Sequence, residues 1–82
     1  MNLVLLTETL IKELVSDPEV VSVKEFESDD DNNIIIEVLV PEKELGKVIG
    51  KNGRIISAVK TIVQASASIN FNKRVNINVD SY

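Results

Sequence analysis

The sequence predicts an α+β domain whose elements follow the order α-β-β-α-α-β, with a three-stranded sheet covered on one face by helices. Three observations lead to this class. Leucines recur at helical spacing near the start of the chain, β-branched residues gather in three short segments, and two helical patterns separate the second segment from the third. Because 82 residues are too few for two ordinary domains, we expect residues 1–82 to form a single domain.

The first half of the chain predicts a helix followed by an antiparallel hairpin. Leucine, isoleucine and valine occur every three or four positions over residues 3–15, and Ser16-Asp17-Pro18 is expected to end this helix. Residues 20–26 are rich in β-branched side chains and predict a strand. Residues 28–33 are all Ser, Asp or Asn and predict a turn. Residues 34–40 predict the second strand, with alternate apolar positions on one face.

The second half predicts two helices and a closing strand. Pro41 can occupy the first turn of a short helix that ends near Gly50. A longer helix is expected after Gly53, because isoleucine, valine and alanine recur at helical spacing as far as Ala67. Valine and isoleucine then alternate with asparagine over residues 75–79, which predicts the third strand.

The charges are unevenly distributed along the chain. Residues 1–37 contain ten acidic and two basic residues and carry a charge of −8, whereas residues 38–82 contain three acidic and seven basic residues and carry +4. These values agree with the net charge of −4. Chance can separate charges in a short chain, but the division favours a basic functional face on an acidic body.

The composition argues against catalysis. The chain has no histidine and no cysteine, so it lacks the commonest general base, disulfides and thiolate metal ligands. A calcium-loop pattern beginning at Asp29 fails because Ile34 replaces its glycine and Val40 its final glutamate. A P-loop pattern fails because it is one residue short and Asn52 replaces its Ser or Thr. We therefore expect no enzyme, no cofactor, no metal site and no small-molecule substrate.

The start of the chain does not resemble a secretory signal. Its apolar residues are interrupted by Glu8, Lys12 and Glu13, and it has neither a basic start nor a small-residue cleavage site. Apolar runs also stay well short of the roughly 20 residues that span a bilayer. We expect a cytoplasmic protein that does not enter the membrane.

The most informative segment is the four-residue link Gly50-Lys51-Asn52-Gly53 between the two predicted helices. Glycine tolerates positive φ and lets a ligand approach the backbone closely. The second helix begins at this link. Its unpaired N–H groups and the positive end of its dipole are therefore both directed toward a ligand at the link. Lys51 lies inside the link, and Lys47 and Arg54 flank it. We expect all three cations to face the same phosphate groups.

A longer pattern contains this link. Ile49-Gly50-x-x-Gly53-x-x-Ile56, preceded by Pro41 and a hairpin, resembles the signature of the KH (K homology) family of RNA-binding domains, whose GXXG loop clamps about four nucleotides of backbone. The element order resembles the type II KH arrangement. Length, order and motif together resemble the small bacterial single-KH-domain proteins of the KhpA-like family over essentially the whole chain.

The resemblance implies a set of RNA-binding residues: Lys47, Ile49, Gly50, Lys51, Asn52, Gly53, Arg54 and Ile56. The two glycines would form the clamp, Lys51 would contact phosphate and Asn52 would make a polar contact. The two isoleucines would pack mainly in the core and expose only their edges to a narrow apolar groove for bases. The resemblance places this groove beside a neighbouring strand, which we take to be residues 34–40, although the sequence does not say which of its residues line it.

The function implied is that of a post-transcriptional regulator or RNA chaperone that binds single-stranded RNA, with single-stranded DNA left open. Pairing as a homodimer, or as a heterodimer with a larger KH-containing protein, would raise the affinity. Only Phe26, Phe71 and Tyr82 are aromatic, too few for the stacking surfaces of other RNA-binding folds. The alternative is a KH-fold protein-interaction or ribosome-assembly module with little RNA binding, in which the acidic half of the chain docks a partner.

Overall fold

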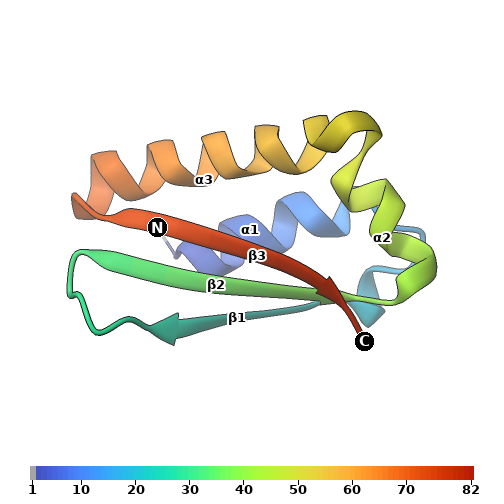
Figure 1. Ribbon diagram of the computed structural model, residues 1–82, viewed down its shortest axis with the longest axis horizontal. Helices are drawn as coiled ribbons and strands as arrows, with labels where there is room; N and C mark the ends of the chain where they lie inside the picture. Colours follow the sequence, from blue (N-terminus) through green and yellow to red (C-terminus); the bar gives the residue numbers. More distant parts are fainter. Residues whose placement is uncertain (1) are drawn as a thin grey trace.

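The computed structural model describes residues 2–82 and has the predicted order of elements (Figure 1). The helices and strands are α1 (Leu3–Lys12), β1 (Ser22–Glu27), β2 (Asn33–Val40), α2 (Glu42–Ile49), α3 (Arg54–Phe71) and β3 (Arg74–Ser81). Two short 3₁₀ turns, η1 (Pro18–Val20) and η2 (Lys51–Gly53), lie before β1 and before α3. The order α-β-β-α-α-β confirms the predicted α+β class.

The three strands form one mixed sheet in the order β1-β2-β3. The hairpin strands β1 and β2 are antiparallel, with Ser22 opposite Leu39. β3 pairs in parallel with β2, with Ile34 opposite Val75. The connection through α2 and α3 therefore returns the chain to the far side of β2, and β3 becomes an edge strand.

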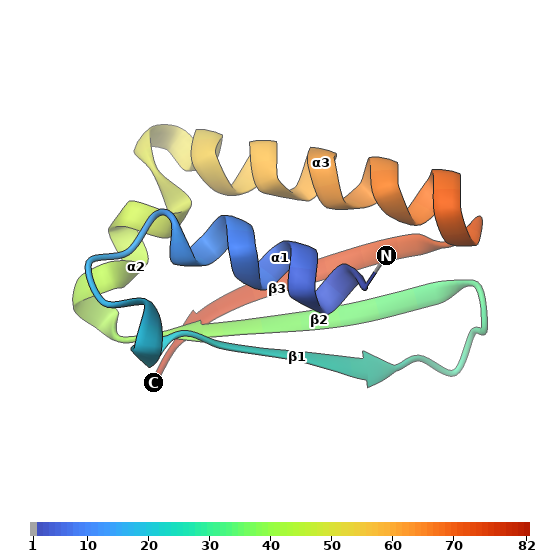
Figure 2. The same ribbon diagram turned by 180° about the vertical axis from the view of Figure 1, so that it is seen from behind.

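The helices cover one face of this sheet. Figures 1 and 2 show α1 and α3 running alongside the strands, while α2 lies at the end of the molecule where β2 finishes. The hydrophobic core lies between the two layers and is formed by Leu3, Ile11, Ile36, Val38, Val40, Val48, Val59, Val63, Ala67, Val75 and Ile77. All of the main elements except β1 contribute buried residues, so burial of apolar surface fixes the helices on the sheet.

Two element boundaries differ from the predictions. α1 ends at Lys12, before the expected stop signal, and Pro18 instead begins the turn η1, where the Asp17 carboxylate accepts the N–H of Glu19 at 3.0 Å. Pro41 precedes α2 as its N-cap, because its ψ of 147° is extended rather than helical. Proline fixes φ but leaves ψ free, so it suits either position.

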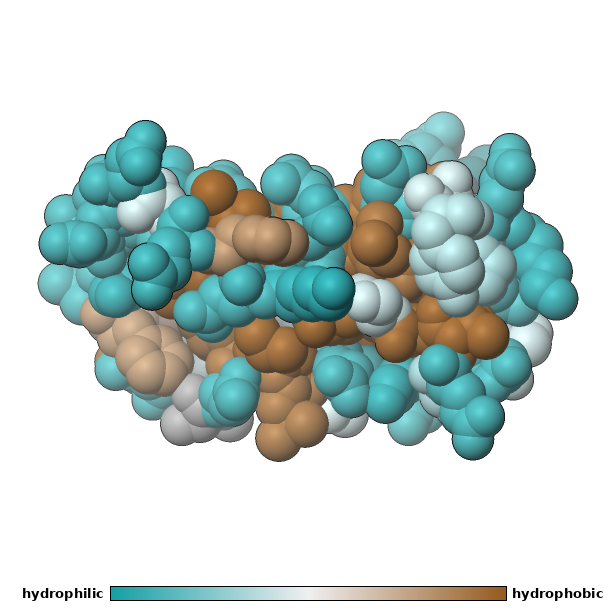
Figure 3. Space-filling view, turned by 90° about the horizontal axis from the view of Figure 1, so that it is seen from below, coloured by the Kyte–Doolittle hydropathy of each residue, from teal (hydrophilic) through white to brown (hydrophobic). Residues whose placement is uncertain are grey.

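The β1 edge of the sheet is charged. Figure 3 views the molecule from below, the side on which β1 lies in Figure 1, and shows hydrophilic side chains with hydrophobic ones between them. Lys24, Glu25 and Glu27 of β1 are exposed. Charged side chains on an edge strand oppose pairing with a strand from another molecule.

Candidate nucleic-acid interface

The glycine loop (residues 50–53) has an unusual backbone. Gly50, Asn52 and Gly53 have φ values of 76°, 59° and 73°. The Gly50 N–H donates to the carbonyl of Gly46 at 2.9 Å, which completes α2, and the Gly53 N–H donates to the carbonyl of Gly50 at 3.1 Å. Three positive φ values in four residues explain why the sequence has glycine, and otherwise asparagine, at these positions.

The two glycines of this loop have different surroundings. A Cβ added to Gly50 would lie 2.5 Å from Cγ1 of Ile55, which is too close for any real contact. A Cβ added to Gly53 would meet no other described atom within 4 Å. Gly50 is therefore packed against the first turn of α3, whereas the backbone at Gly53 borders open space that a ligand can enter.

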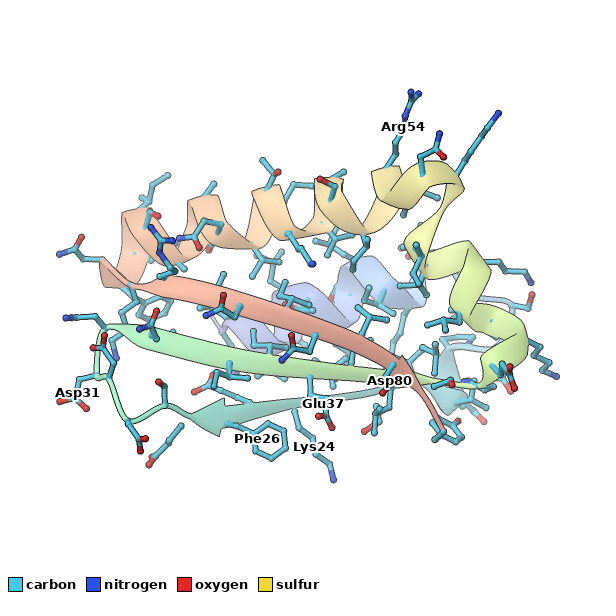
Figure 4. All side chains as sticks on the ribbon, in the orientation of Figure 1. Lys24, Phe26, Asp31, Glu37, Arg54 and Asp80 are labelled. Atoms are coloured by element: carbon cyan, nitrogen blue, oxygen red, sulfur yellow. The ribbon has the colours of Figure 1, made fainter. Side chains whose placement is uncertain are left out.

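Helix α3 begins at this open side of the loop. Its N-cap is Gly53, and among residues 2–82 no side chain caps the N–H groups of its first turn. These groups and the helix dipole make the N-terminus of α3 partly positive. Lys51, Asn52 and Arg54 are exposed around it, and Figure 4 shows Arg54 pointing away from the body of the molecule.

Lys47 lies in a different environment from the other two predicted cations. Its ammonium donates to Oγ of Ser16 and lies 3.5 Å from Oε2 of Glu44. Glu44 is buried and accepts the Ser16 N–H at 3.0 Å. That hydrogen bond, helped by the nearby Lys47 charge, lowers the pKa of Glu44. The cluster Ser16–Glu44–Lys47 therefore ties α2 to the chain after α1, and of the three predicted site cations Lys51 and Arg54 are exposed without a described ion-pair partner.

The predicted apolar residues on either side of the loop are only partly exposed. Ile49 and Ile56 are both half-buried, and Ile56 packs against the hydrophobic core. For Ile56 this burial agrees with the expected core packing, whereas Ile49 is not among the residues packed against that core.

An open groove of about 640 Å³ lies between α3 and β3, and we call it the α3–β3 groove. It is lined by Ser57, Lys60, Thr61, Gln64, Ala65, Val75, Asn76, Ile77 and Asn78. Ser57 is in the first turn of α3, so the groove starts next to the glycine loop. Lys60 adds a third cation along it.

This groove lies beside a different strand from the one expected to border the bases. Residues 34–40 belong to the central strand β2, where Ile36, Val38 and Val40 are fully buried, and none of the residues lining the groove comes from it. Because β3 pairs beyond β2 at the edge of the sheet, β3 is the strand that faces α3 across the groove. Lys60, Gln64 and the strand asparagines were not predicted as site residues. The local signal for Lys60 and Gln64 was their i,i+4 spacing on one helix face, and that for the asparagines was their alternation with apolar residues in the strand.

The acidic residues lie mostly away from the loop. Figure 4 shows Glu37 pointing below the sheet with Lys24 and Phe26, and Asp31 at the end of the molecule opposite Arg54. Lys73 of the basic half lines the same hollow as Asp30 and Asp31, so the charge division along the sequence is only partly a division in space.

An α-β-β-α-α-β domain with a glycine-framed loop between its last two helices is a type II KH domain. A family model described as the KhpA/KhpB KH domain matches residues 5–79. The chain belongs to this family, which is not an enzyme family, as the sequence predicted.

Individual relatives agree with this assignment. The RNA-binding protein KhpA of Clostridium acetobutylicum is 42% identical over 74 residues, which cover 90% of this chain and 95% of the relative. The RNA-binding protein KhpA of Caldanaerobacter subterraneus subsp. tengcongensis is 45% identical over 62 residues, covering 76% and 80%. The RNA-binding protein KhpA of Chlamydia pneumoniae is 41% identical over 70 residues, covering 85% and 86%.

The fold is also similar to part of a larger protein. The crystal structure of Era in complex with MgGDPNP and nucleotides 1506–1542 of 16S ribosomal RNA matches with a TM-score of 0.69 at 18% identity. The match covers 96% of this chain and 29% of the Era chain. A structure of Aquifex aeolicus Era bound to GDP and aluminium fluoride matches with a TM-score of 0.68.

Two further properties concern only the part of the chain that the structure describes. Within residues 2–82, no helix is long and apolar enough to cross a membrane. Within the same residues, no three His, Cys, Asp or Glu side chains are grouped so that they could hold a metal ion.

Proposed function

We propose that this protein binds single-stranded RNA by gripping about four nucleotides of the backbone at the glycine loop and placing bases in the α3–β3 groove. The observation that supports this most is the N-terminus of α3, which no described side chain caps, beside the open side of Gly53, with Lys51 and Arg54 exposed next to it. The proposal includes a cytoplasmic location and a role as post-transcriptional regulator or RNA chaperone, as the family resemblance implies.

The local charges set the expected strength of binding. The net charge of −4 gives little long-range attraction to RNA, so affinity depends on contacts at the site. Three cations, Lys51, Arg54 and Lys60, lie at the loop or along the groove. If each neutralises one phosphate, the logarithm of the binding constant falls with the logarithm of salt concentration with a slope of about −2.

The double variant Lys51→Asp, Asn52→Asp tests the loop. Both residues are exposed, and Asp tolerates the positive φ of Asn52, so the fold should survive. We expect binding to a mixed single-stranded RNA pool to disappear while the melting temperature stays unchanged.

A matched control is available at the other end of α3. Asn72 also has a positive φ of 53°, and exposed Lys73 follows it, so Asn72→Asp, Lys73→Asp changes the charge equally. We expect this control to keep most RNA binding. Equal loss in both variants would indicate a general charge effect, and no binding by the wild type would favour the alternative of a protein-interaction or ribosome-assembly module.

We also propose that the protein pairs with a second copy of itself through the outer face of α3. Ile62 and Ile69 are 48% and 82% exposed although both are large and apolar. They alternate with alanine in a row with spacings of three and four residues: Ile55, Ala58, Ile62, Ala65 and Ile69. Such spacing forms a seam along one side of a helix, and in an antiparallel pair Ile62 and Ile69 can each pack against an alanine of the other copy.

Sedimentation velocity over a range of protein concentrations tests this pairing. The wild type should shift from monomer to dimer as concentration rises, and Ile69→Lys should stay monomeric with an unchanged fold because Ile69 lies outside the core. A wild type that stays monomeric throughout would contradict the homodimer. Pairing with a larger KH-containing protein would then be the form to test.

A further inference from the structure

Gln64 uses its whole carboxamide to join the two walls of the α3–β3 groove. From α3, its Oε1 accepts the backbone N–H of Val75 at 3.0 Å. Its Nε2 donates to the carbonyl of Lys73 at 3.2 Å and to Oγ of Ser68 at 2.9 Å. One side chain thus satisfies both a donor and an acceptor of the backbone that enters β3.

These bonds lie on the free edge of the sheet. The Arg74 N–H donates to the carbonyl of Asn32 at 2.9 Å, on the side of β2. Successive residues of a strand direct their backbone groups to opposite sides, so the Val75 N–H is directed away from β2, where Gln64 meets it. The backbone groups of Ile77 are directed to the same edge, further along the groove, where no β-strand among residues 2–82 pairs with them.

Gln64 therefore has two effects on the groove. Its hydrogen bonds hold the edge strand β3 at a fixed distance from α3, just as hydrogen bonds from a neighbouring strand would hold it. It also occupies the backbone at Val75 and separates the groove from a smaller hollow of about 220 Å³, which is lined by Gln64, Ser68, Asn72, Lys73 and Arg74. An edge strand without such support is more mobile, because fewer interactions hold it.

We infer that Gln64 is a positioning residue for base recognition: with its carboxamide hydrogen-bonded to Ser68, Lys73 and Val75, it sets the width of the α3–β3 groove. The inference rests on the proposed RNA binding. Bases in single-stranded RNA are distinguished by hydrogen bonds to their edges, and such bonds require the edge strand to be held in place. Loss of Gln64 should therefore reduce discrimination between bases more than it reduces binding to phosphate.

Gln64→Ala, compared with the wild type on short single-stranded RNA homopolymers of A, C and U, tests this inference. Two hydrogen bonds to the backbone of Lys73 and Val75, where the chain enters β3, are lost, so we expect the ratio between the best-bound and worst-bound homopolymer to fall by about threefold to tenfold. The salt dependence of binding should stay unchanged, because the cations at the loop are intact. Amide hydrogen exchange at Val75 should become faster, while that at Ile36 in β2 stays slow.

Two further variants keep the test decisive if Gln64→Ala folds poorly. Gln64→Glu retains the acceptor for Val75 but places an anionic oxygen against the Lys73 carbonyl, so it should also reduce discrimination. Ser68→Ala removes a partner of Gln64 that lies on α3 itself and should leave discrimination unchanged. Unchanged discrimination in both Gln64 variants would overturn the positioning role alone. A wild type that binds no homopolymer would overturn the proposed RNA binding and this inference together.

Discussion

The two ends of helix α3 are built from the same residue types but have opposite surroundings. Asn52 before the helix and Asn72 after it both adopt a left-handed backbone, with φ values of 59° and 53°. Each is next to an exposed lysine, Lys51 at the first end and Lys73 at the second. Residue type alone would assign the two ends the same role.

The backbone distinguishes them. At the end of α3, the N–H groups of Asn72 and Lys73 both donate to the carbonyl of Ala67, and Gln64 donates to the Lys73 carbonyl. This end therefore uses its backbone groups internally, and the helix dipole makes it partly negative. At the start of α3 the dipole has the opposite sign, and no described side chain caps the N–H groups. An exposed lysine favours a phosphate site only where the helix also supplies a positive end.

The largest expected effect comes from Gly50→Ala in the glycine loop. The new Cβ would collide with Ile55, and alanine would have to adopt a φ of 76°. Backbone strain and overpacking together should lower the free energy of unfolding by about 2–4 kcal/mol. Urea unfolding followed by circular dichroism measures this loss.

Gly53→Ala is the internal control for that variant. Its φ of 73° is nearly the same, but open space surrounds the new Cβ, so the loss should be only about 1 kcal/mol. Equal losses in the two variants would mean that the contact with Ile55 does not hold the loop. Because a ligand is expected on its open side, Gly53→Ala should weaken RNA binding more than its small effect on stability suggests.

A pH-dependent effect is expected from Glu44, which holds α2 in place before the loop. A carboxyl whose pKa is lowered by folding stabilises the protein above its ordinary pKa, and this stabilisation disappears as the pH falls through the lowered value. Glu44→Gln should therefore be less stable than the wild type at neutral pH, and the difference should shrink in acid. Urea unfolding over a series of pH values measures it. A difference that stays constant from neutral pH to acid would contradict the role of the ionised carboxylate.

Local signals made the element order and the glycine loop predictable. The spacing of apolar residues and the pair Gly50 and Gly53 depend only on neighbours in the sequence. The sequence did not indicate that β3 borders the α3–β3 groove, because strand order depends on how α2 and α3 return the chain to the sheet. The contact of Lys47 with Ser16 joins residues 31 positions apart. The bonds from Gln64 to β3 likewise depend on packing that no local pattern encodes.

The smallest effects, and the most direct comparison of the two ends, come from Asn52→Ala and Asn72→Ala. Both asparagines have left-handed backbones and exposed side chains, so each variant should lose a similar stability of about 1 kcal/mol. RNA binding should separate the pair: Asn52→Ala should weaken it, whereas Asn72→Ala should leave it unchanged. Titration of both variants with the same RNA, at a temperature where both are folded, measures the difference. Equal weakening by both would mean that binding responds to stability alone and that the start of α3 has no special role.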